Sequence, residues 1–413
     1  MARKMKDSGI EWIGEIPEGW EVVPVKRLCT MQAGKNLTSE QIAPEGTYPV
    51  YGGNGIRGFF SDYNCDGQFL TVGRQGALCG NVHKINGKVW ATEHAVITTP
   101  SSYTILDFLY YLLIGMDLNQ YVSSTAAQPG LAVGTLLNLK TCYPCSTLEQ
   151  TQISNYLNAK CSEIDIMLTK TRSSIEEYKK LKQAVITQAV TKGVRGEREM
   201  KDSGVEWIGK IPREFDPVQL KFFCKLITDG THFSPTTVEN GWPYITAGDV
   251  HGIGLDYNSA KRISEEDFQL LVTQGCQPLK GDVLLVKDGA TTGRVGFVDS
   301  DTPCVILSSV AMLRPADNTD GHYLMYLLAS DFLQKQILVS MAGSAMPRTT
   351  LTKLTKYIGL LPPLHEQKEI ANYLDAKCAE IDGLIAKKEQ LVKELEGYKK
   401  SLIYEVVTGK REV

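Results

Sequence analysis

Two stretches of the chain place apolar residues mostly three, four or seven positions apart, which is the spacing of one helix face. The first stretch carries Leu157, Cys161, Ile164, Leu168, Ile175, Tyr178 and Val185. The second carries Leu374, Cys378, Ile381, Ile385, Val392, Leu395 and Leu402. Each stretch predicts a helix of roughly 35–40 residues, or about 50–60 Å. We expect Gly383 and Gly397 to loosen the second helix locally.

A long helix with a single apolar stripe needs a partner that covers the stripe. Two matching stripes in one chain most simply cover each other as a coiled coil. Since each helix would leave one domain and return to the other, we expect an antiparallel pair with approximate two-fold symmetry. Taken alone, the stripes favour a plain dimerisation or scaffold device.

The chain also repeats itself in two places, and such repetition indicates a duplicated architecture. Residues 5–17 recur at 200–212 with two differences, an offset of 195, and residues 149–191 return at 366–408, an offset of 217. The second region between these repeats is therefore 22 residues longer than the first. A repeated frame that holds two diverged inserts indicates one task performed on two targets.

The two inserts are faintly related to each other. Residues 69–72 and 283–286 are both apolar runs that predict buried strands, and each is followed by a Gly-x-x-x-Gly segment. The runs 109–113 and 324–328 are a second matching pair. The inserts therefore share a probable core and differ in their surface residues.

Composition and charge narrow the picture only slightly. The 413 residues suggest two to three domains, and 43% hydrophobic with 22% charged residues fits a soluble globular protein. The longest apolar run, Phe108 to Met116, is too short for a membrane span, and the start of the chain has no signal-like apolar core. We therefore expect a cytoplasmic protein without a membrane partner. A net charge of −3 does not by itself indicate nucleic-acid binding.

A search for catalytic or metal-binding motifs favours a recognition protein over an enzyme. Residues 53–58 fit Gly-x-Gly-x-x-Gly, but the following residues are typical of strand and turn, so we interpret the segment as a hairpin. Residues 289–294 lack the ending of a phosphate loop, and Cys142 with Cys145 lacks the second pair of a zinc site. We expect the ten cysteines to be reduced.

The repeated Gly-Ile/Val-Glu-Trp-Ile-Gly-x-Ile-Pro segment, the Glu-Gln followed by Ile-x-Asn-Tyr-Leu, and the Lys-Cys-x-Glu-Ile-Asp run are highly specific. They resemble the specificity subunits of type I restriction–modification enzymes, and the likeness covers nearly the whole chain. The segments Asp229-Gly230-Thr231-His232 and Pro243-Tyr244-Ile245 also resemble parts of that family's recognition domains.

The resemblance implies an α+β fold with two globular α/β target-recognition domains separated by two long antiparallel helices. It divides the chain into recognition domain 1 (1–148), spacer helix 1 (149–195), recognition domain 2 (196–364) and spacer helix 2 (365–413). Each domain would read one half of a bipartite site in double-stranded DNA, and the helices would set the gap.

The resemblance also implies the partners. The helices would dock two copies of a methyltransferase subunit that binds S-adenosylmethionine and methylates adenine. Restriction subunits would supply ATP- and Mg-dependent translocation and cleavage. This chain would carry no cofactor and no catalytic residue. The alternative is a coiled-coil adaptor whose inserts bind proteins.

Arg and Lys suit guanine, Asn and Gln suit adenine, and many donors suit phosphate, so polar residues in glycine-rich loops are the candidates for DNA contact. In the first domain the candidates are Lys35, Asn54, Arg57, Arg74, Gln75 and Lys84. In the second they are Thr231, His232, Lys287, Thr291, Thr292, Arg294 and Arg348. The loops at 73–76 and 287–294 lead this set, because both follow the matching buried strands.

Two pairs of residues in the repeated frame have structural expectations instead. We expect Trp12 and Trp207 to anchor each domain to the helices or to a partner protein. We expect Asp7 and Asp202 to cap turns or helices.

Overall fold

A computed structural model describes residues 3–76, 79–122, 130–205, 208–341 and 347–413. It divides the chain into two compact units. The first comprises Met1–Arg172 with Glu389–Val413, and the second comprises Ser173–Lys388. Each long helix is therefore shared, with one half in each unit.

The first unit holds a β-rich domain and the neighbouring halves of the two long helices. Its strands are β1 (Met5–Asp7), β2 (Glu15–Pro17), β3 (Trp20–Pro24), β4 (Cys29–Ala33), β5 (Tyr48–Gly52), β6 (Gly55–Phe60), β7 (Gln68–Gly73), β8 (Val82–Asn86), β9 (Trp90–Ala91), β10 (Ala95–Pro100) and β11 (Lys140–Pro144). Its short helices are α1 (Leu106–Gly115) and α2 (Val133–Asn138).

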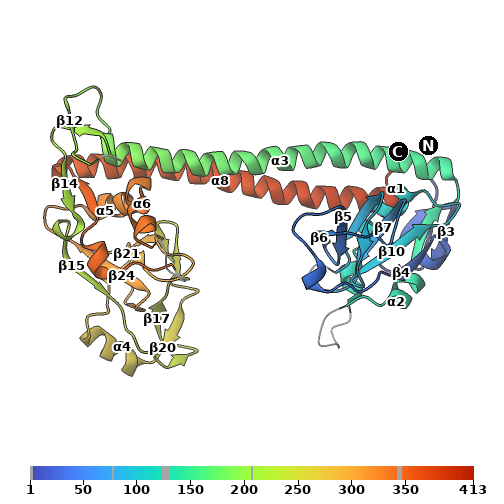
Figure 1. Ribbon diagram of the computed structural model, residues 1–413, viewed down its shortest axis with the longest axis horizontal. Helices are drawn as coiled ribbons and strands as arrows, with labels where there is room; N and C mark the ends of the chain where they lie inside the picture. Colours follow the sequence, from blue (N-terminus) through green and yellow to red (C-terminus); the bar gives the residue numbers. More distant parts are fainter. Residues whose placement is uncertain (1–2, 77–78, 123–129, 206–207, 342–346) are drawn as a thin grey trace. The chain divides into compact units, whose positions relative to one another are not determined.

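The first domain contains two larger sheets beside the two-stranded pairs β1-β2 and β11-β3. One has four strands in the order β4-β10-β7-β8, all antiparallel, and α1 packs against it (Figure 1). The other has the order β6-β5-β9, in which β5 and β6 form a hairpin and β5 pairs with β9 in parallel. The hairpin predicted at residues 53–58 and the strand predicted at 69–72 are both confirmed.

The second unit repeats this plan with additions. Its strands are β12 (Met200–Asp202), β13 (Lys210–Pro212), β14 (Asp216–Gln219), β15 (Cys224–Asp229), β16 (Thr237–Val238), β17 (Trp242–Ile245), β18 (Val250–His251), β19 (Gly254–Leu255), β20 (Lys261–Ile263), β21 (Val283–Val286), β22 (Val295–Phe297), β23 (Val305–Ile306), β24 (Val310–Pro315) and β25 (Ile358–Leu361). Its short helices are α4 (Glu265–Thr273), α5 (Gly321–Ala329), α6 (Asp331–Ser340) and α7 (Leu351–Leu354).

The two larger sheets of the second domain contain the strand orders of the first domain's larger sheets, with β16 added at the edge of one of them. The order β15-β24-β21-β22 corresponds to β4-β10-β7-β8, and β20-β17-β23 corresponds to β6-β5-β9, again with one parallel pair. The helices α1 and α5, which contain the matching apolar runs, are both largely buried. The faint likeness between the inserts is thus a shared core.

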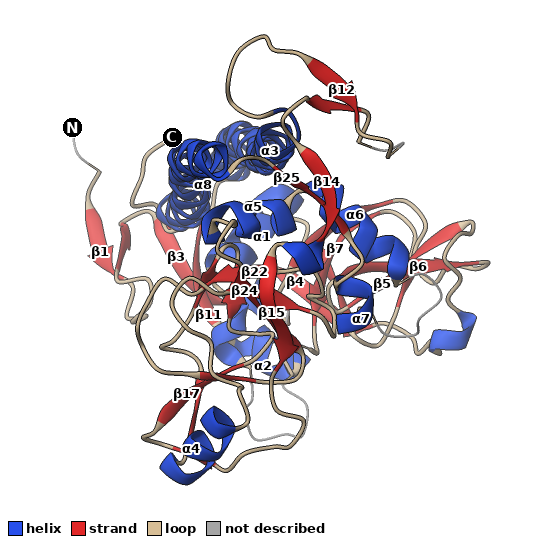
Figure 2. Ribbon diagram, turned by 90° about the vertical axis from the view of Figure 1, so that its left-hand side faces the viewer, coloured by secondary structure: helices blue, strands red, loops and turns tan. Residues whose placement is uncertain are grey.

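The long helices are α3 (Thr147–Lys192) and α8 (Leu364–Val407), of 46 and 44 residues. Both are longer than the stripes predicted, because the apolar positions continue into the ends that the domains bury. Val190 is buried in the second unit's core and Val407 in the first unit's core. The helix α8 continues through Gly383 and Gly397, and the local loosening expected there stays a prediction. Figure 2 shows both long helices nearly end-on.

In the first unit the two helices run antiparallel. Asp165 of α3 accepts hydrogen bonds from Lys399 of α8 at 2.7 and 2.8 Å. One or two turns further along α3, Arg172 pairs with Glu396 at 2.5 Å. Residue numbers rise on one helix as they fall on the other, as an antiparallel pair requires.

The second unit repeats this arrangement. Lys182 of α3 donates to Asp382 of α8 at 2.8 and 2.6 Å, and the Lys388 ammonium lies 5.7 Å from the ring centre of Tyr178. Lys182 and Asp382 are the counterparts of Lys399 and Asp165 at the offset of 217. The internal symmetry predicted from the repeat is therefore present in the contacts of each unit.

A buried glutamine joins α3 to the first domain. Gln150 is completely buried. Its side-chain oxygen accepts from the backbone N–H of Ile105 at 2.8 Å, at the start of α1. Its amide nitrogen donates to the carbonyls of Tyr103 and Pro144 at 3.2 and 3.0 Å. One side chain therefore satisfies three main-chain groups that surround the beginning of α3.

Gln367 does the same at the beginning of α8. It is also completely buried, and its side-chain oxygen accepts from the N–H of Asp320 at 2.8 Å, at the start of α5. Its nitrogen donates to the carbonyls of Asn318 and Pro362 at 3.0 and 2.9 Å. The Gln of each repeated Glu-Gln pair therefore connects a long helix to its domain through hydrogen bonds.

The Glu of the same pair holds the segment that precedes each domain. Glu149 pairs with Arg3 and accepts from the indole N–H of Trp20 at 3.0 Å. Glu366 pairs with Arg198 at 2.6 Å. Arg3 and Arg198 are counterparts at the offset of 195. In each copy, therefore, the segment before the domain is bonded to the Glu-Gln pair at the start of the long helix.

The other expectations for the frame are met where the structure describes them. The Tyr404 hydroxyl of α8 donates to the carbonyl of Trp12 at 3.0 Å, so Trp12 does anchor the first domain to a helix. Trp207 lies outside the described residues. Asp7 and Asp202 each accept at 2.9 Å from the N–H two residues later, which makes them turn caps.

Replacing Gln150 or Gln367 with alanine should destabilise the protein by about 1–3 kcal/mol, because buried main-chain groups would lose their partner. Urea unfolding of the full chain, followed by circular dichroism, measures this. Gln152, which is exposed on the same helix, provides the matched control. Gln152→Ala should leave the stability nearly unchanged, and an equal effect of the two substitutions would contradict the assigned role.

Candidate nucleic-acid interface

In the second domain, the ends of β15 and β21 bring several predicted residues together. Asp229 is the last residue of β15, and Lys287 and Asp288 directly follow β21. A bridge joins Asp288 to Arg348, which is far away in the sequence. The carbonyl of Lys287 also accepts from the N–H of Thr349 at 2.9 Å.

These side chains form a chain of ion pairs. The Lys287 ammonium lies 3.3 Å from a carboxylate oxygen of Asp229 and 2.6 Å from one of Asp288. The other Asp288 oxygen lies 2.9 Å from Nε of Arg348. His232 lies 3.7 Å from Asp229. The chain of charges therefore leads from the interior to the surface.

Burial divides the roles within this chain. The side chain of Lys287 is only 4% exposed, whereas that of Arg348 is 62% exposed. A buried ammonium requires compensating charge, and the two aspartates provide it. We therefore assign Lys287 a positioning role, whereas Arg348 and the exposed His232 are the members that can reach a ligand.

The remaining candidates of the second domain surround this chain. Thr231 is buried, and its hydroxyl accepts from the N–H of Phe233 at 3.2 Å. Thr292 donates through its hydroxyl to the carbonyl of Gly289 at 2.7 Å, which closes the turn after β21. Thr291 in that turn is half-buried, and Arg294 just after it is exposed.

The first domain has the same loops with other residues. Arg74 follows β7, its Nε donates to the carbonyl of Leu131 at 3.3 Å, and Gln75 forms a bridge with Gly130. The N–H of Leu131 also bonds the carbonyl of Arg74 at 2.8 Å, which matches the bond between Thr349 and Lys287. Lys35 is exposed after β4. The loops predicted to be equivalent do occupy equivalent places in the two domains.

Two glycines, Gly34 and Gly230, let the backbone at the start of these loops pack closely against the second sheet of each domain. An added Cβ at Gly34 would lie 2.2 Å from the carbonyl oxygen of Ala91, and one at Gly230 would lie 1.9 Å from that of Ile306. Both glycines directly follow the first strand of a four-stranded sheet. A side chain would not fit at either position, so glycine lets the two sheets of each domain meet there.

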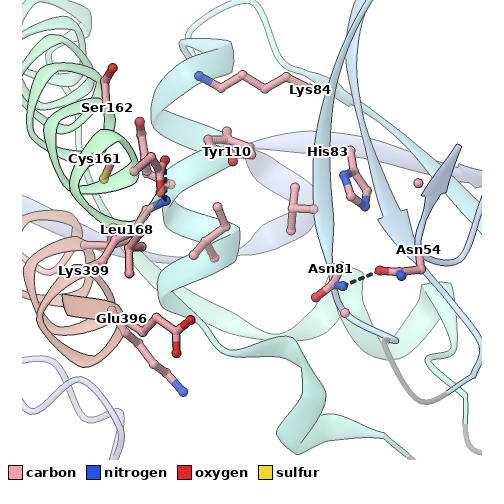
Figure 3. A pocket seen from close by; sticks show the side chains of 18 of the residues that line it. Asn54, Asn81, His83, Lys84, Tyr110, Cys161, Ser162, Leu168, Glu396 and Lys399 are labelled. Carbon is pink, nitrogen blue, oxygen red and sulfur yellow. Dashed lines mark hydrogen bonds and ion pairs between the residues drawn. The ribbon is translucent and has the colours of Figure 1, made fainter. Parts of the chain in front are cut away.

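A groove of about 1410 Å³ lies within the first unit, between the domain and the two helices (Figure 3). Asn54, which accepts from the amide of Asn81 at 2.7 Å, and His83 line the domain side. Lys399 and Glu396 line the side formed by α8. The groove brings predicted loop residues and helix residues to one surface.

Two predicted residues of the first domain lie on strands, which corrects their expected place in glycine-rich loops. Arg57 is exposed on β6. Lys84 is on β8, pairs with Asp107 of α1 at 2.8 Å, and lies 4.4 Å from the ring centre of Tyr110. Successive side chains of a strand point to opposite faces of the sheet, and Lys84 lies on the face that α1 covers. Its ammonium therefore also helps to hold α1 against the sheet.

Two pKa shifts accompany the groove. Burial lowers the pKa of His83, so its ring is neutral at pH 7. Burial alone would raise the pKa of Asp107, but hydrogen bonds from Lys84 and Asn158 outweigh it and the pKa is lowered. Asp107 is therefore ionised and keeps its pairing with Lys84 at neutral pH.

Comparison with known proteins decides what these domains are. The family model described as "Type I restriction modification DNA specificity domain" matches residues 17–177 and again 212–394. The two matches cover most of the chain. The chain belongs to this family.

Relatives agree with this assignment. The specificity subunit of the type I restriction enzyme MjaVIII of Methanocaldococcus jannaschii is 25% identical over 422 residues, covering 96% of this chain and 93% of that one. That of EcoprrI of Escherichia coli is 45% identical over 121 residues, which span 28% of this chain and 30% of that relative. The protein is thus a specificity subunit with two target-recognition domains, and its role is DNA recognition, not catalysis.

A solved structure shows the same fold. A chain from a study of complex assembly and conformational transition of the type I R-M system gives a TM-score of 0.70 at 16% identity, and the match covers 96% of this chain and 99% of that one.

Among the described residues of the specificity subunit, no three His, Cys, Asp or Glu side chains are grouped as metal ligands would be. Of the helices in the described ranges, none has the length and apolar run needed to cross a bilayer.

Sequence reasoning missed some residues of these surfaces. Asp229 and Asp288 were absent from the candidates, although each stands beside one of them in the sequence. Lys170, Lys399 and Lys400 line the groove but belong to the long helices, for which a spacing and docking role was predicted and no DNA contact. The available signal for the first group was the position of each aspartate next to a loop glycine, Gly230 and Gly289.

Substituting Lys287 with methionine should destabilise the second domain by about 3 kcal/mol, because Asp229 and Asp288 would keep charge without a buried partner. Thermal and urea unfolding of the full chain measure the loss. Lys280, an exposed lysine paired with Asp301 at 3.2 Å, is the matched control. Lys280→Met should have no measurable effect, and the same result for Lys287→Met would show that the buried pairing is unimportant.

Proposed function

We propose that each recognition domain of this specificity subunit reads one half of a bipartite site in double-stranded DNA. The observation that carries this proposal is the pair of matching loops with different residues. Gln75 and Gly130 in one domain occupy the place of Asp288 and the exposed Arg348 in the other. One scaffold that presents two sets of donors and acceptors suits two different base sequences.

The spacing between the half-sites is assigned to the helices. Each helix starts in one domain, where a buried glutamine fixes it, and ends in the core of the other unit. A helix rises about 1.5 Å per residue and resists bending far more than a flexible linker does. The helix pair is therefore suited to hold a fixed gap between two reading surfaces.

The helices also offer a surface for partner subunits. Ile166, Met167, Leu181 and Leu391 are exposed apolar side chains on α3 and α8. Exposed apolar side chains mark a protein interface where they gather into a patch, and Ile166 and Met167 stand side by side in the sequence. We assign this surface to two copies of the methyltransferase subunit, with the restriction subunits joining that complex.

The chemistry then belongs to the partners. S-adenosylmethionine would be bound by the methyltransferase subunits, and ATP and Mg by the restriction subunits. A methylated adenine must leave the base stack, and the partner that modifies it would extract it. This chain steers both activities by choosing the site, and we expect it to act in the cytoplasm.

Exchanging residues 21–147 for the recognition domain of another specificity subunit should change only one half of the methylated sequence. The reason is that each domain has its own sheets and core. The reconstituted complex with its methyltransferase subunits is incubated with genomic DNA, and the methylated sites are mapped. A change in both halves would refute modular reading. Failure of the unaltered complex to bind any DNA would favour the adaptor alternative.

Inserting seven residues into each long helix, after Arg172 and after Lys388, should lengthen the gap between half-sites by about three base pairs. Seven residues add about 10.5 Å of helix, and duplex DNA rises about 3.4 Å per base pair. The same mapping of methylated sites gives the gap. A complex that methylates with an unchanged gap would show that the helices do not set it.

A further inference from the structure

We propose that Arg348 reads a guanine in the half-site of the second domain, and that Asp229, Lys287 and Asp288 hold it in the reading position. This inference rests on the proposed function and names a base and a residue for it.

A buried chain of charges is a costly way to fold a domain. Taking Lys287 and two carboxylates out of water carries a desolvation penalty, and apolar residues of similar size would be at least as stabilising. This chain of ion pairs occurs in the second domain. The first domain has the same fold with Arg74, Gln75 and Gly130 at the matching positions. The fold therefore does not need these ions, and another task must account for them.

The geometry of Arg348 indicates that task. The Asp288 carboxylate lies 2.9 Å from Nε, and this ion pair keeps the guanidinium beside the end of β21. Within the described ranges, no hydrogen bond or ion pair engages its two terminal nitrogens, and the side chain is 62% exposed. Two parallel N–H donors held in one plane match the O6 and N7 acceptors of guanine in the major groove.

The backbone around Arg348 is held on both sides. The carbonyl of Pro347 accepts from the N–H of Gly289 at 3.0 Å and from the hydroxyl of Thr292 at 3.2 Å. The Thr349 N–H bonds Lys287, and its hydroxyl lies 2.6 Å from that of Tyr357. A residue that reads a base must be held within about half an ångström, and such bonds provide that rigidity.

The first domain offers an internal comparison. Gly130 stands where the second domain has Arg348, and Gln75 stands where it has Asp288. The first domain therefore lacks the supported arginine at this place. A difference that changes a base-reading donor while leaving the backbone bonds in place is expected of a specificity position.

The experiment uses the full chain assembled with its methyltransferase subunits and a library of duplex DNA with randomised sequence. Methylated molecules are sequenced for the wild type and for Arg348→Ala, Arg348→Lys and Asp288→Asn. Arg213→Ala is the control, because Arg213 is an arginine of similar exposure, 66%, paired with Glu199. Thermal unfolding of every variant confirms that the second domain is folded.

For the wild type we expect an obligatory G·C pair in one half-site. Arg348→Ala should reduce the discrimination at that base pair roughly 5- to 100-fold and leave the other half-site unchanged. Arg348→Lys should lose part of it, because an ammonium cannot bond both acceptors in one plane. Asp288→Asn should relax the same base pair, and Arg213→Ala should change nothing.

Two results would overturn the inference while the proposed function stands. One is an unchanged consensus in Arg348→Ala, and the other is a uniform loss of affinity for all sequences with a shallower salt dependence, which marks a phosphate contact. If the wild-type complex shows no bipartite site at all, the proposed function fails and this inference fails with it.

Discussion

A buried glutamine amide at the start of each long helix is the interaction on which the rest of the molecule depends. Gln150 and Gln367 each satisfy three main-chain groups where a domain meets its helix. Buried polar groups without partners are costly, so these bonds allow only a narrow range of domain orientations on the helix. The neighbouring Glu149 and Glu366 bind the preceding segment at the same point. A reading surface attached in this way is held by a helix and not by a flexible loop.

Most of the positive side chains described above are paired with carboxylates, so the net charge of the protein says little about its function. Lys399 and Lys182 are neutralised across the helix pair by Asp165 and Asp382, and Lys84 is neutralised by Asp107. In the second domain, Lys287 lies between two carboxylates, while Arg348 and His232 at the two ends of that chain of ion pairs extend into solvent. A net charge of −3 is compatible with DNA recognition because a few placed cations matter more than the sum.

The two domains show how one backbone can serve two targets. Their sheets share strand order and the single parallel pair, and their loops share the bonds after β7 and β21. Glycines at 34 and 230 keep the sheets in close contact, so the core tolerates little change. The loops keep the same backbone bonds in both domains, so their side chains can differ without a change of the fold.

The sequence by itself determined the duplication, the helix pair and the division into frame and inserts. Periodicity follows from residues that lie near one another in the chain, and repetition follows from comparing two stretches of it, so neither requires knowledge of the fold. The antiparallel pairing of the helices, the hairpin at 53–58 and the buried strands at 69–72 and 283–286 could be predicted for that reason. The helix ends were not, because their apolar residues are buried by a domain distant in the sequence.

The tertiary structure alone decided which candidate residues can act. Lys287 and Arg348 look alike as cationic loop residues, yet one is buried between two aspartates and the other is held at the surface by one of them. Lys84 was placed in a loop, whereas the pleat of β8 directs it to α1. Burial and pairing depend on residues about 60 positions away along the chain, such as Asp229 and Arg348 around Lys287. No local pattern carries that information, because long-range contacts set the electrostatic surroundings of each side chain.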